Sequence, residues 1–200
     1  MRRPRRPSRV PRDIVTVLAA AGMVFIARSS FADHYRVPSG SMEPTVHVGD
    51  RIIVSKLAYG LRMPLTHVQM IAFHAPTRGD VVVLDSPESG VVLLKRVVAI
   101  GGDRVAVRGG TLTINGLEQP TMSDGGVLAE SLDGRPHALG SLGGTELAET
   151  VIPTGQLLVM GDNRGDSHDG RDFGFVSADR VLGRAMAVFL RDGALGWHSL

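Results

Sequence analysis

Cysteine is absent from the 200 residues, which excludes a disulfide-stapled scaffold, catalysis by a thiol and any zinc site with sulfur ligands. Lysine is nearly absent too, since only Lys56 and Lys95 stand among the 22 basic residues. None of the seven histidines forms an HExxH pattern or an i, i+4 pair, and no GxSxG string surrounds a serine. The usual signatures of a histidine-based triad or metalloprotease are therefore missing.

Outside the N-terminus, neither positive nor negative charge is in large excess. The chain is 43% hydrophobic and 21% charged, ordinary proportions that exclude a disordered chain or a multi-span membrane bundle. The net charge of +2 hides an asymmetry, because six of the 22 basic residues precede the first acid, which leaves 16 basic against 20 acidic residues after them. A basic excess confined to a proline-rich tail does not predict a nucleic-acid-binding face. The six residues are Arg2, Arg3, Arg5, Arg6, Arg9 and Arg12.

The longest uncharged apolar run covers residues 14–26. As a helix it spans only about 20 Å, whereas a bilayer core is about 30 Å thick. We predict a basic cytoplasmic tail over 1–13 and one transmembrane helix over 14–32, with the remainder outside the cytoplasm by the positive-inside rule. A cleaved signal peptide ending at Ser30-Phe31-Ala32, an organellar transit peptide and a buried core helix are the alternatives.

Residues 33–192 are predicted to form a mostly β domain. Short β-branched runs alternate with Gly, Asp and Pro, and Gly109-Gly110 between two runs indicates a hairpin. No long amphipathic helices separate the runs, which favours an antiparallel barrel or packed sheets. We expect an accessory excursion over about 104–150, a Gly-rich surface loop over 124–145 and a C-terminal tail over 193–200. The predicted strands cover 51–57, 80–85, 91–100, 104–107, 111–114, 156–160 and 180–190.

The most unusual local string is PSGSMEPT at residues 38–45. Its two prolines, glycine and two serines exclude a regular strand or helix, so it is predicted to be a shaped loop that exposes a hydroxyl and backbone N–H groups. Such clusters are usually plain turns, and a serine reacts only with a base nearby.

Lys95 is the preferred candidate for that base. Strand alternation places it on an apolar face with Leu93 and Val97, and burial there lowers the pKa of an amine and favours its neutral form. A neutral lysine is a competent base in a Ser-Lys pair. The alternatives are a lysine that snorkels to solvent, and Lys56 as the base. Arg96, on the opposite face, is expected to be structural.

Residues 161–174, which we call the acidic loop, combine four aspartates with two arginines. Asp162, Asp166 and Asp169 offer oxygen ligands for calcium, but the EF-hand spacing is missing. The interspersed arginines favour a loop braced by Asp–Arg pairs that positions a hydroxyl such as Ser167. His168, within this loop, is the one histidine retained as a candidate.

Taken together and in this order, the strings resemble the bacterial type I signal peptidases (leader peptidases), which are membrane-bound serine proteases of the Ser-Lys type. The resemblance covers most of residues 37–176. Its motifs are PSGSMEPT at 38–45, GDRIIVSKLAYG at 49–60, GDVVVLDSP at 79–87, LLKRVVAIGGD at 93–103 and GDNRGDSHDGRDFGFV at 161–176.

The resemblance implies that Ser41 is the nucleophile and Lys95 the general base, with the Ser39 hydroxyl and the Ser41 N–H forming the oxyanion hole. It also implies a catalytic core of coiled antiparallel β-sheets with a small β-ribbon excursion. Substrates would be cut after small residues in an Ala-x-Ala pattern, and shallow apolar pockets lined by residues like Ile71 or Leu84 are expected to select them. Four residues are implied to support the site: Ser167, Asp162, Asp169 and Arg171.

The expected function is a membrane-bound serine endopeptidase that removes signal peptides from exported preproteins without a cofactor or metal. Its expected partners are preprotein signal peptides, membrane lipid and the export translocon, and not nucleic acid. We expect it in the cell membrane, with the N-terminus cytoplasmic and the catalytic domain outside. The alternatives are a relative dedicated to a narrow substrate such as a conjugative pilin, a mitochondrial inner-membrane peptidase, or an inert membrane-tethered β domain that binds peptides by strand addition.

Overall fold

A computed structural model describes residues 14, 16, 17, 32–62, 69–119, 121–124 and 127–200. The predicted basic tail over 1–13 and nearly all of the predicted membrane helix over 14–32 lie outside the described residues. Within the described part of the chain, none of the helices combines the length and the apolar character that a membrane span requires.

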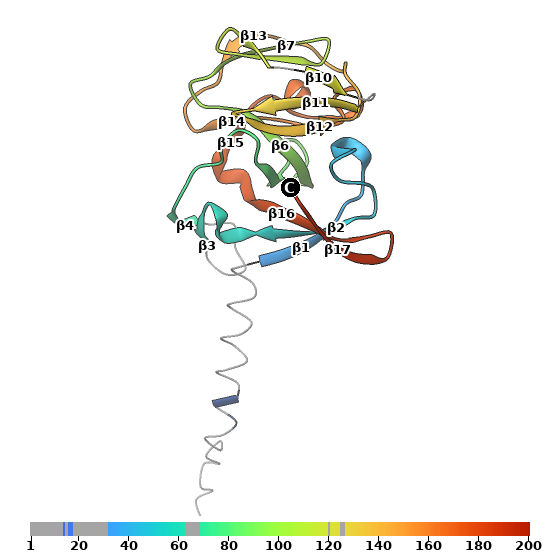
Figure 1. Ribbon diagram of the computed structural model, residues 1–200. Coiled ribbons are helices and arrows are strands. Elements are labelled where there is room, and N and C mark those ends of the chain that lie inside the picture. Colours follow the sequence, from blue (N-terminus) through green and yellow to red (C-terminus); the bar gives the residue numbers. More distant parts are fainter. Residues whose placement is uncertain (1–13, 15, 18–31, 63–68, 120, 125–126) are drawn as a thin grey trace, which may run out of the picture.

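An antiparallel sheet forms the body of the molecule (Figure 1). Its strands follow the order β1-β2-β16-β5-β6-β14-β15, and β17 pairs with β16 at the side. The prediction of a mostly β, antiparallel fold is confirmed. The strands are β1 (Ala32–Arg36), β2 (Arg51–Ser55), β5 (Val81–Asp85), β6 (Val92–Ile100), β14 (Gln156–Met160), β15 (Val176–Ser177), β16 (Val181–Arg191) and β17 (Ala194–Ser199).

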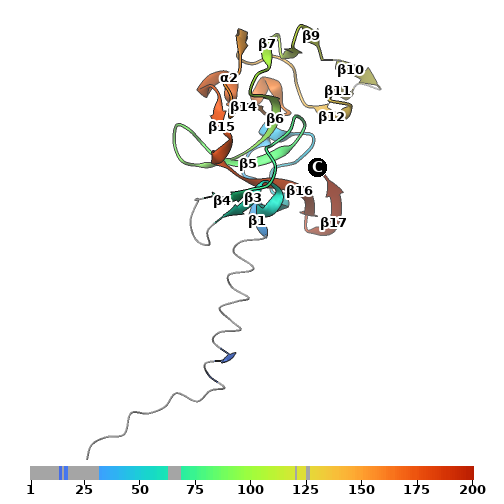
Figure 2. The same ribbon diagram turned by 90° about the vertical axis from the view of Figure 1, so that its left-hand side faces the viewer.

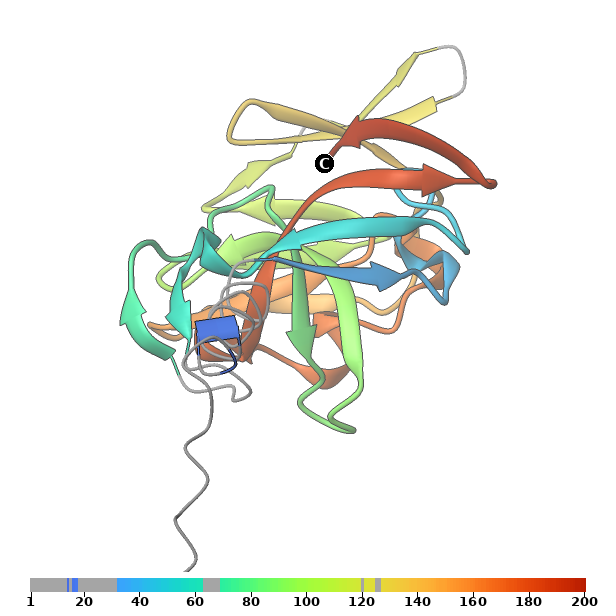
Figure 3. The same cartoon turned by 90° about the horizontal axis from the view of Figure 1, so that it is seen from below.

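β16 is the strand that curls this sheet. Its first residues pair with β5 and its later residues with β2, and the register shifts along both pairings. Such shifts mark bulges, which bend a strand and increase its twist. Gly183 lies at the crossing, where a Cβ would stand 2.6 Å from the Ser55 carbonyl oxygen, so only glycine fits. Seen from below, β1, β2 and β16 lie side by side (Figure 3).

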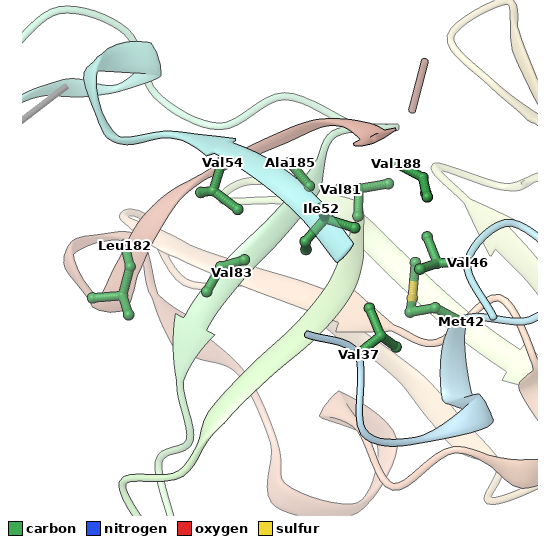
Figure 4. Close-up of a cluster of buried hydrophobic side chains, with 10 residues drawn as sticks. All are labelled: Val37, Met42, Val46, Ile52, Val54, Val81, Val83, Leu182, Ala185 and Val188. Atoms are coloured by element: carbon green, nitrogen blue, oxygen red, sulfur yellow. The ribbon is translucent and has the colours of Figure 1, made fainter. Parts of the chain in front are cut away.

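β5 shows why a continuous apolar strand stands at the centre. Because side chains alternate along a strand, Val81 and Val83 enter one buried cluster while Val82 and Leu84 enter another on the opposite face. The first cluster also contains Met42, from the segment after β1 (Figure 4). The sheet core and the PSGSMEPT loop are therefore packed as one unit.

Smaller sheets lie at one end of the molecule and are called the accessory sheets here (Figures 1 and 2). One has the order β13-β7-β8-β9 and the other β10-β11-β12. β7 and β8 form the hairpin predicted at Gly109-Gly110. The strands are β7 (Arg104–Arg108), β8 (Thr111–Ile114), β9 (Leu117–Glu118), β10 (Thr121–Asp124), β11 (Val127–Leu132), β12 (Arg135–Leu139) and β13 (Leu147–Val151), while β3 (Gly60–Arg62) and β4 (Gln69–Ala72) form a separate ribbon beside the main sheet.

The prediction of a surface loop over 124–145 was wrong for much of that region. β11 and β12 pair as a hairpin, and Leu132 and Leu139 are buried. Glycines and polar residues interrupt the alternation of apolar side chains in this region. The residues that bury these strands come from distant segments, which the local sequence does not reveal. The expected tail over 193–200 likewise contains β17. Short helices complete the fold: η1 (Gly40–Met42), η2 (Lys56–Ala58), η3 (Arg164–Asp166), α2 (Gly170–Phe173) and η4 (Ala178–Arg180).

Candidate active site

Ser41 lies in η1, a single helical turn at the centre of the PSGSMEPT loop. The Glu43 N–H closes the turn on the Gly40 carbonyl at 3.0 Å. The next side chain, Met42, is 1% exposed and packs into the cluster of Figure 4. Ser41 itself is half-buried, Ser39 is exposed, and their Oγ atoms lie 3.5 Å apart. The buried Met42 side chain thus fixes the turn that carries Ser41, while the Ser41 hydroxyl remains accessible.

Asn163, in the acidic loop, also holds this turn in place, through two hydrogen bonds. Its backbone N–H donates to the Ser41 carbonyl at 3.1 Å, and its Nδ2 donates to the Gly40 carbonyl at 3.3 Å. Ser141 Oγ in turn donates to Asn163 Oδ1 at 2.6 Å. Asn163 was not among the predicted site residues, since only the ionisable and hydroxyl groups of this loop were candidates. A side-chain amide can donate and accept at once, which suits Asn163 to link Ser141 to the Gly40 carbonyl.

Lys95 is buried, with 3% of the residue exposed, and stands opposite Val82 in the β5–β6 pairing. Its Nζ donates to Ser167 Oγ at 2.9 Å. Burial lowers the pKa of Lys95 to about 8, against the opposing pull of the Asp169 charge. The alternative of a lysine with a solvated head disagrees with this burial.

Gly161 brings the serine loop and the lysine partner together. A Cβ at this position would lie 2.3 Å from Ser167 Oγ and 2.4 Å from the Ser41 carbonyl oxygen. Real Cβ atoms do not approach other atoms so closely, so the junction requires glycine. Ser41, Ser167 and Lys95 therefore converge from η1, the acidic loop and β6.

Asp162 connects the same three segments by charge. Its carboxylate accepts from Arg96 Nε at 2.8 Å and Arg96 Nη2 at 2.7 Å, a paired geometry that is strong and directional. It also accepts from Thr45 Oγ1 at 2.6 Å. Asp162 and Arg96 are both buried. This pair holds β6 and the PSGSMEPT loop against the acidic loop.

Asp169 and Arg171 brace the far end of the acidic loop. Asp169 caps α2 and accepts from the Gly161 N–H at 3.0 Å. Arg171 donates to Asp169 through Nε and Nη2, both at 2.9 Å, and to the Gly143 carbonyl at 2.8 Å. Burial acts to raise the pKa of Asp169, but Arg171 and the Gly161 N–H, with a smaller contribution from Ser167, together outweigh it and lower that pKa. The loop is therefore held by ion pairs.

The remaining candidates from the sequence make their contacts at or near the surface. Lys56 Nζ pairs with Asp33 Oδ2 at 3.0 Å near the surface. The His168 side chain is 64% exposed and pairs with Glu88 Oε2 at 2.9 Å. Asp166 is exposed. Across the ranges that the structure describes, no group of three His, Asp or Glu side chains could hold a metal ion.

An apolar recess of about 120 Å³ lies beside the serine loop. Two of its lining residues, Pro38 and Leu94, directly precede Ser39 and Lys95 in the sequence. Neither Ile71 nor Leu84 lines this recess, since Leu84 is fully buried in the core and Ile71 is 52% exposed on β4. The recess is formed mainly by Tyr35, Val37, Pro38, Ile52, Val83 and Leu94.

Comparison with known proteins gives a consistent family. The family model described as "Signal peptidase, peptidase S26" matches residues 12–190. Signal peptidase I of Pseudomonas aeruginosa is 33% identical over 201 residues, covering 84% of this chain and 68% of that protein. Probable signal peptidase I-1 of Synechocystis is 30% identical, covering 94% and 87%.

A solved signal peptidase I from Enterococcus faecalis V583 is 30% identical, with a TM-score of 0.40, and covers 56% of this chain and 98% of that chain. Because the family model extends over most of the sequence and the Pseudomonas aeruginosa relative exceeds 30% identity, the assignment does not depend on that superposition. The chain belongs to the signal peptidase, peptidase S26 family and is a serine peptidase of the signal peptidase I type.

Proposed function

We propose that this protein is a membrane-bound endopeptidase that removes N-terminal signal peptides from exported preproteins, with Ser41 as nucleophile and Lys95 as general base. The observation that carries the proposal is the buried Lys95 amine, hydrogen-bonded to Ser167 at the glycine junction where the Ser41 backbone also lies. Family membership supports the removal of signal peptides. The inert peptide-binding alternative disagrees with that membership.

In the proposed acylation step, the Ser41 hydroxyl attacks the scissile carbonyl while the neutral Lys95 amine accepts its proton. The resulting ammonium then donates that proton to the leaving amine, so the peptide bond breaks and an acyl-enzyme forms. The hydrogen bond to Ser167 fixes the direction of the amine. A pKa of about 8 leaves an appreciable neutral fraction near neutral pH.

The oxyanion of the tetrahedral intermediate is proposed to accept from the Ser41 N–H and the Ser39 hydroxyl. Both donors belong to one anchored turn, so little reorganisation is needed when negative charge develops. The accessible Ser39 Oγ, 3.5 Å from Ser41 Oγ, is free to rotate toward that charge. Deacylation follows the same path, with water in place of the serine and Lys95 again as the base.

The apolar recess and the edge of β6 support a preference for small residues. β14 pairs with β6 only as far as Arg96, which leaves the Val92–Leu94 edge beside the recess for an extended peptide. In an extended peptide, alternate side chains share a face, so positions −1 and −3 turn toward the recess together. A volume of about 120 Å³ suits small side chains, which is the Ala-x-Ala pattern.

The location and partners of the enzyme form part of the proposal. The basic tail and apolar run of residues 1–32 would retain it as a single-pass protein of the cell membrane, with the catalytic domain outside the cytoplasm. Substrates would arrive there on their own hydrophobic signal peptides, delivered by the export translocon.

The test is cleavage of a preprotein with an Ala-x-Ala site by the detergent-solubilised full chain. We expect product from the parent and from Lys56→Ala, the only other lysine, and none from Ser41→Ala or Lys95→Ala, each shown to be folded by thermal unfolding. Replacing the −1 alanine by leucine should abolish cutting. Activity retained by Lys95→Ala would refute the assignment of the base. If the parent cut only one specialised substrate, it would instead be a dedicated relative.

A further inference from the structure

A fully buried ion pair connects the accessory sheets to the acidic loop. Glu130 of β11 is 1% exposed and Arg164 of η3 is 0% exposed. Arg164 Nη1 donates to Glu130 Oε1 at 3.0 Å and Nη2 donates to Oε2 at 2.5 Å. Burying two charges is rarely the best route to stability, since apolar residues of similar size often do as well. A pair retained at this depth is better explained by the arrangement that it fixes.

Arg164 binds more than Glu130. Its Nη1 also donates to the Gly110 carbonyl in the β7–β8 turn, and its Nε donates to the Gly161 carbonyl. Its own carbonyl accepts from Arg171 Nη2 at 2.7 Å. The Arg164 side chain therefore links two accessory sheets to the start of the acidic loop, and the Arg164 carbonyl links them to Arg171 near its far end.

The residue next to Arg164 reaches the nucleophile directly. Asn163 donates to the carbonyls of Ser41 and Gly40, and three residues beyond Arg164 stands Ser167, which accepts from Lys95. η3 thus carries a contact to the serine on one side and a contact to the lysine on the other. A displacement of Arg164 would move both contacts at once.

Glu130 is suited to hold Arg164 at any working pH. Burial acts to raise the pKa of Glu130, but His137 and Arg164 outweigh it and bring that pKa to about 2. His137 Nε2 lies 3.3 Å from Glu130 Oε2. The carboxylate therefore remains an anion, and neither it nor the Arg164 guanidinium faces solvent.

We propose that Glu130 is a positioning residue for peptide cleavage, which acts on Ser41 through Arg164 and Asn163. The accessory sheets then serve the reaction by supplying the counterion that sets the geometry of η3. The proposal deepens the function proposed above and depends on it. Glu130 does not touch the substrate, so its removal should lower kcat without weakening substrate binding.

The experiment compares Glu130→Gln with Glu149→Gln in the full chain, using the Ala-x-Ala preprotein. Glu149 is a matched control, because it also lies in an accessory sheet and pairs with an arginine, Arg104, at 3.0 Å, but on the surface. We expect Glu130→Gln to lose roughly 10- to 100-fold in kcat, the scale of an ångström misplacement, with KM within twofold. Glu149→Gln should match the parent, and Glu130→Asp, which keeps the charge, should recover part of the loss.

A double-mutant cycle with Asn163→Ala separates positioning from general damage to the fold. If Glu130 acts through Asn163, the two losses in kcat will be clearly less than multiplicative, whereas Glu149→Gln and Asn163→Ala will multiply. Normal kcat in Glu130→Gln, or a loss that multiplies fully with that of Asn163→Ala, overturns the proposal. If Glu130→Gln does not fold, Glu130→Asp is judged in the same cycle. An inactive parent would instead refute the proposed function, so the two failures are distinguishable.

Discussion

Replacing Lys95 by methionine should abolish cleavage and make the protein more stable. The pKa of Lys95 falls from its ordinary value of 10.5 to about 8 because the folded protein buries the amine. The unfolded chain therefore holds the proton more tightly than the folded chain. At 1.36 kcal/mol for each pKa unit, the charged lysine costs the native state about 3 kcal/mol below pH 8. Methionine fills a similar volume without that cost.

The pH dependence gives the sign of this effect. Because the folded pKa lies below the unfolded one, the parent gains stability as the pH rises from about 8 to 10.5, and the cost disappears above that range. The advantage of Lys95→Met should therefore be about 3 kcal/mol at pH 7 and about half of that at pH 9.5.

The assay is urea unfolding of the parent and variant in the same detergent at both pH values. Lys56→Met is the control, because that lysine pairs with Asp33 near the surface, and losing such a pair costs only about 0–1 kcal/mol. A Lys95→Met variant that is less stable than the parent at pH 7, or equally advantaged at both pH values, would refute the idea that burial keeps the amine neutral.

Three further predictions concern activity. The kcat/KM of the parent should rise roughly 90-fold from pH 6 to pH 9 and then level off, because the neutral fraction of Lys95 grows from about 1% to about 90%. A pH profile that is flat across this range would count against an amine base. Ser39→Ala should lower kcat roughly 100-fold and leave KM within twofold, as the loss of one oxyanion donor does, and an unchanged kcat would remove Ser39 from the oxyanion hole. Gly161→Ala should lose at least 100-fold in kcat, because its Cβ would collide with the Ser41 carbonyl and Ser167 Oγ. The control is Gly196→Ala, which should match the parent because its Cβ meets only the end of a flexible side chain, at 3.3 Å. Similar losses of kcat in both variants would contradict the reasoning.

Much of the main sheet could be predicted from the sequence, because its central strands are buried on both faces. Continuous runs of valine and leucine, as in 81–84, mark such strands without tertiary information. Strand alternation also placed Lys95 on an apolar face with Leu93 and Val97, but it left a lysine with a solvated head as an alternative. Edge strands such as β1 and β17 were missed because their side chains are largely exposed, and an exposed strand carries little alternation.

The parts of the site that could not be predicted depend on contacts distant in sequence. Nothing local to Glu130 indicates burial, since its partner Arg164 is 34 residues away. Asn163 likewise acquires its contact to Ser41 only when two separate loops meet. The apolar recess could not be predicted for a related reason: it is formed by four segments, and no single strand shows which of its faces remains open.

The three segments that meet at Gly161 have a consequence for the timing of activity. Ser41, Lys95 and Ser167 come from early, middle and late parts of the chain. In a growing polypeptide, the proposed active site is therefore not assembled until β14 has paired with β6 and brought the acidic loop into place. Contacts of such long sequence separation form late, because the chain must first close large loops. With the proposed Ser41–Lys95 pair, the protease stays inactive until residues 156–167 have been synthesised and folded into place. This delay protects the nascent chain from premature cleavage, as latency does in a zymogen.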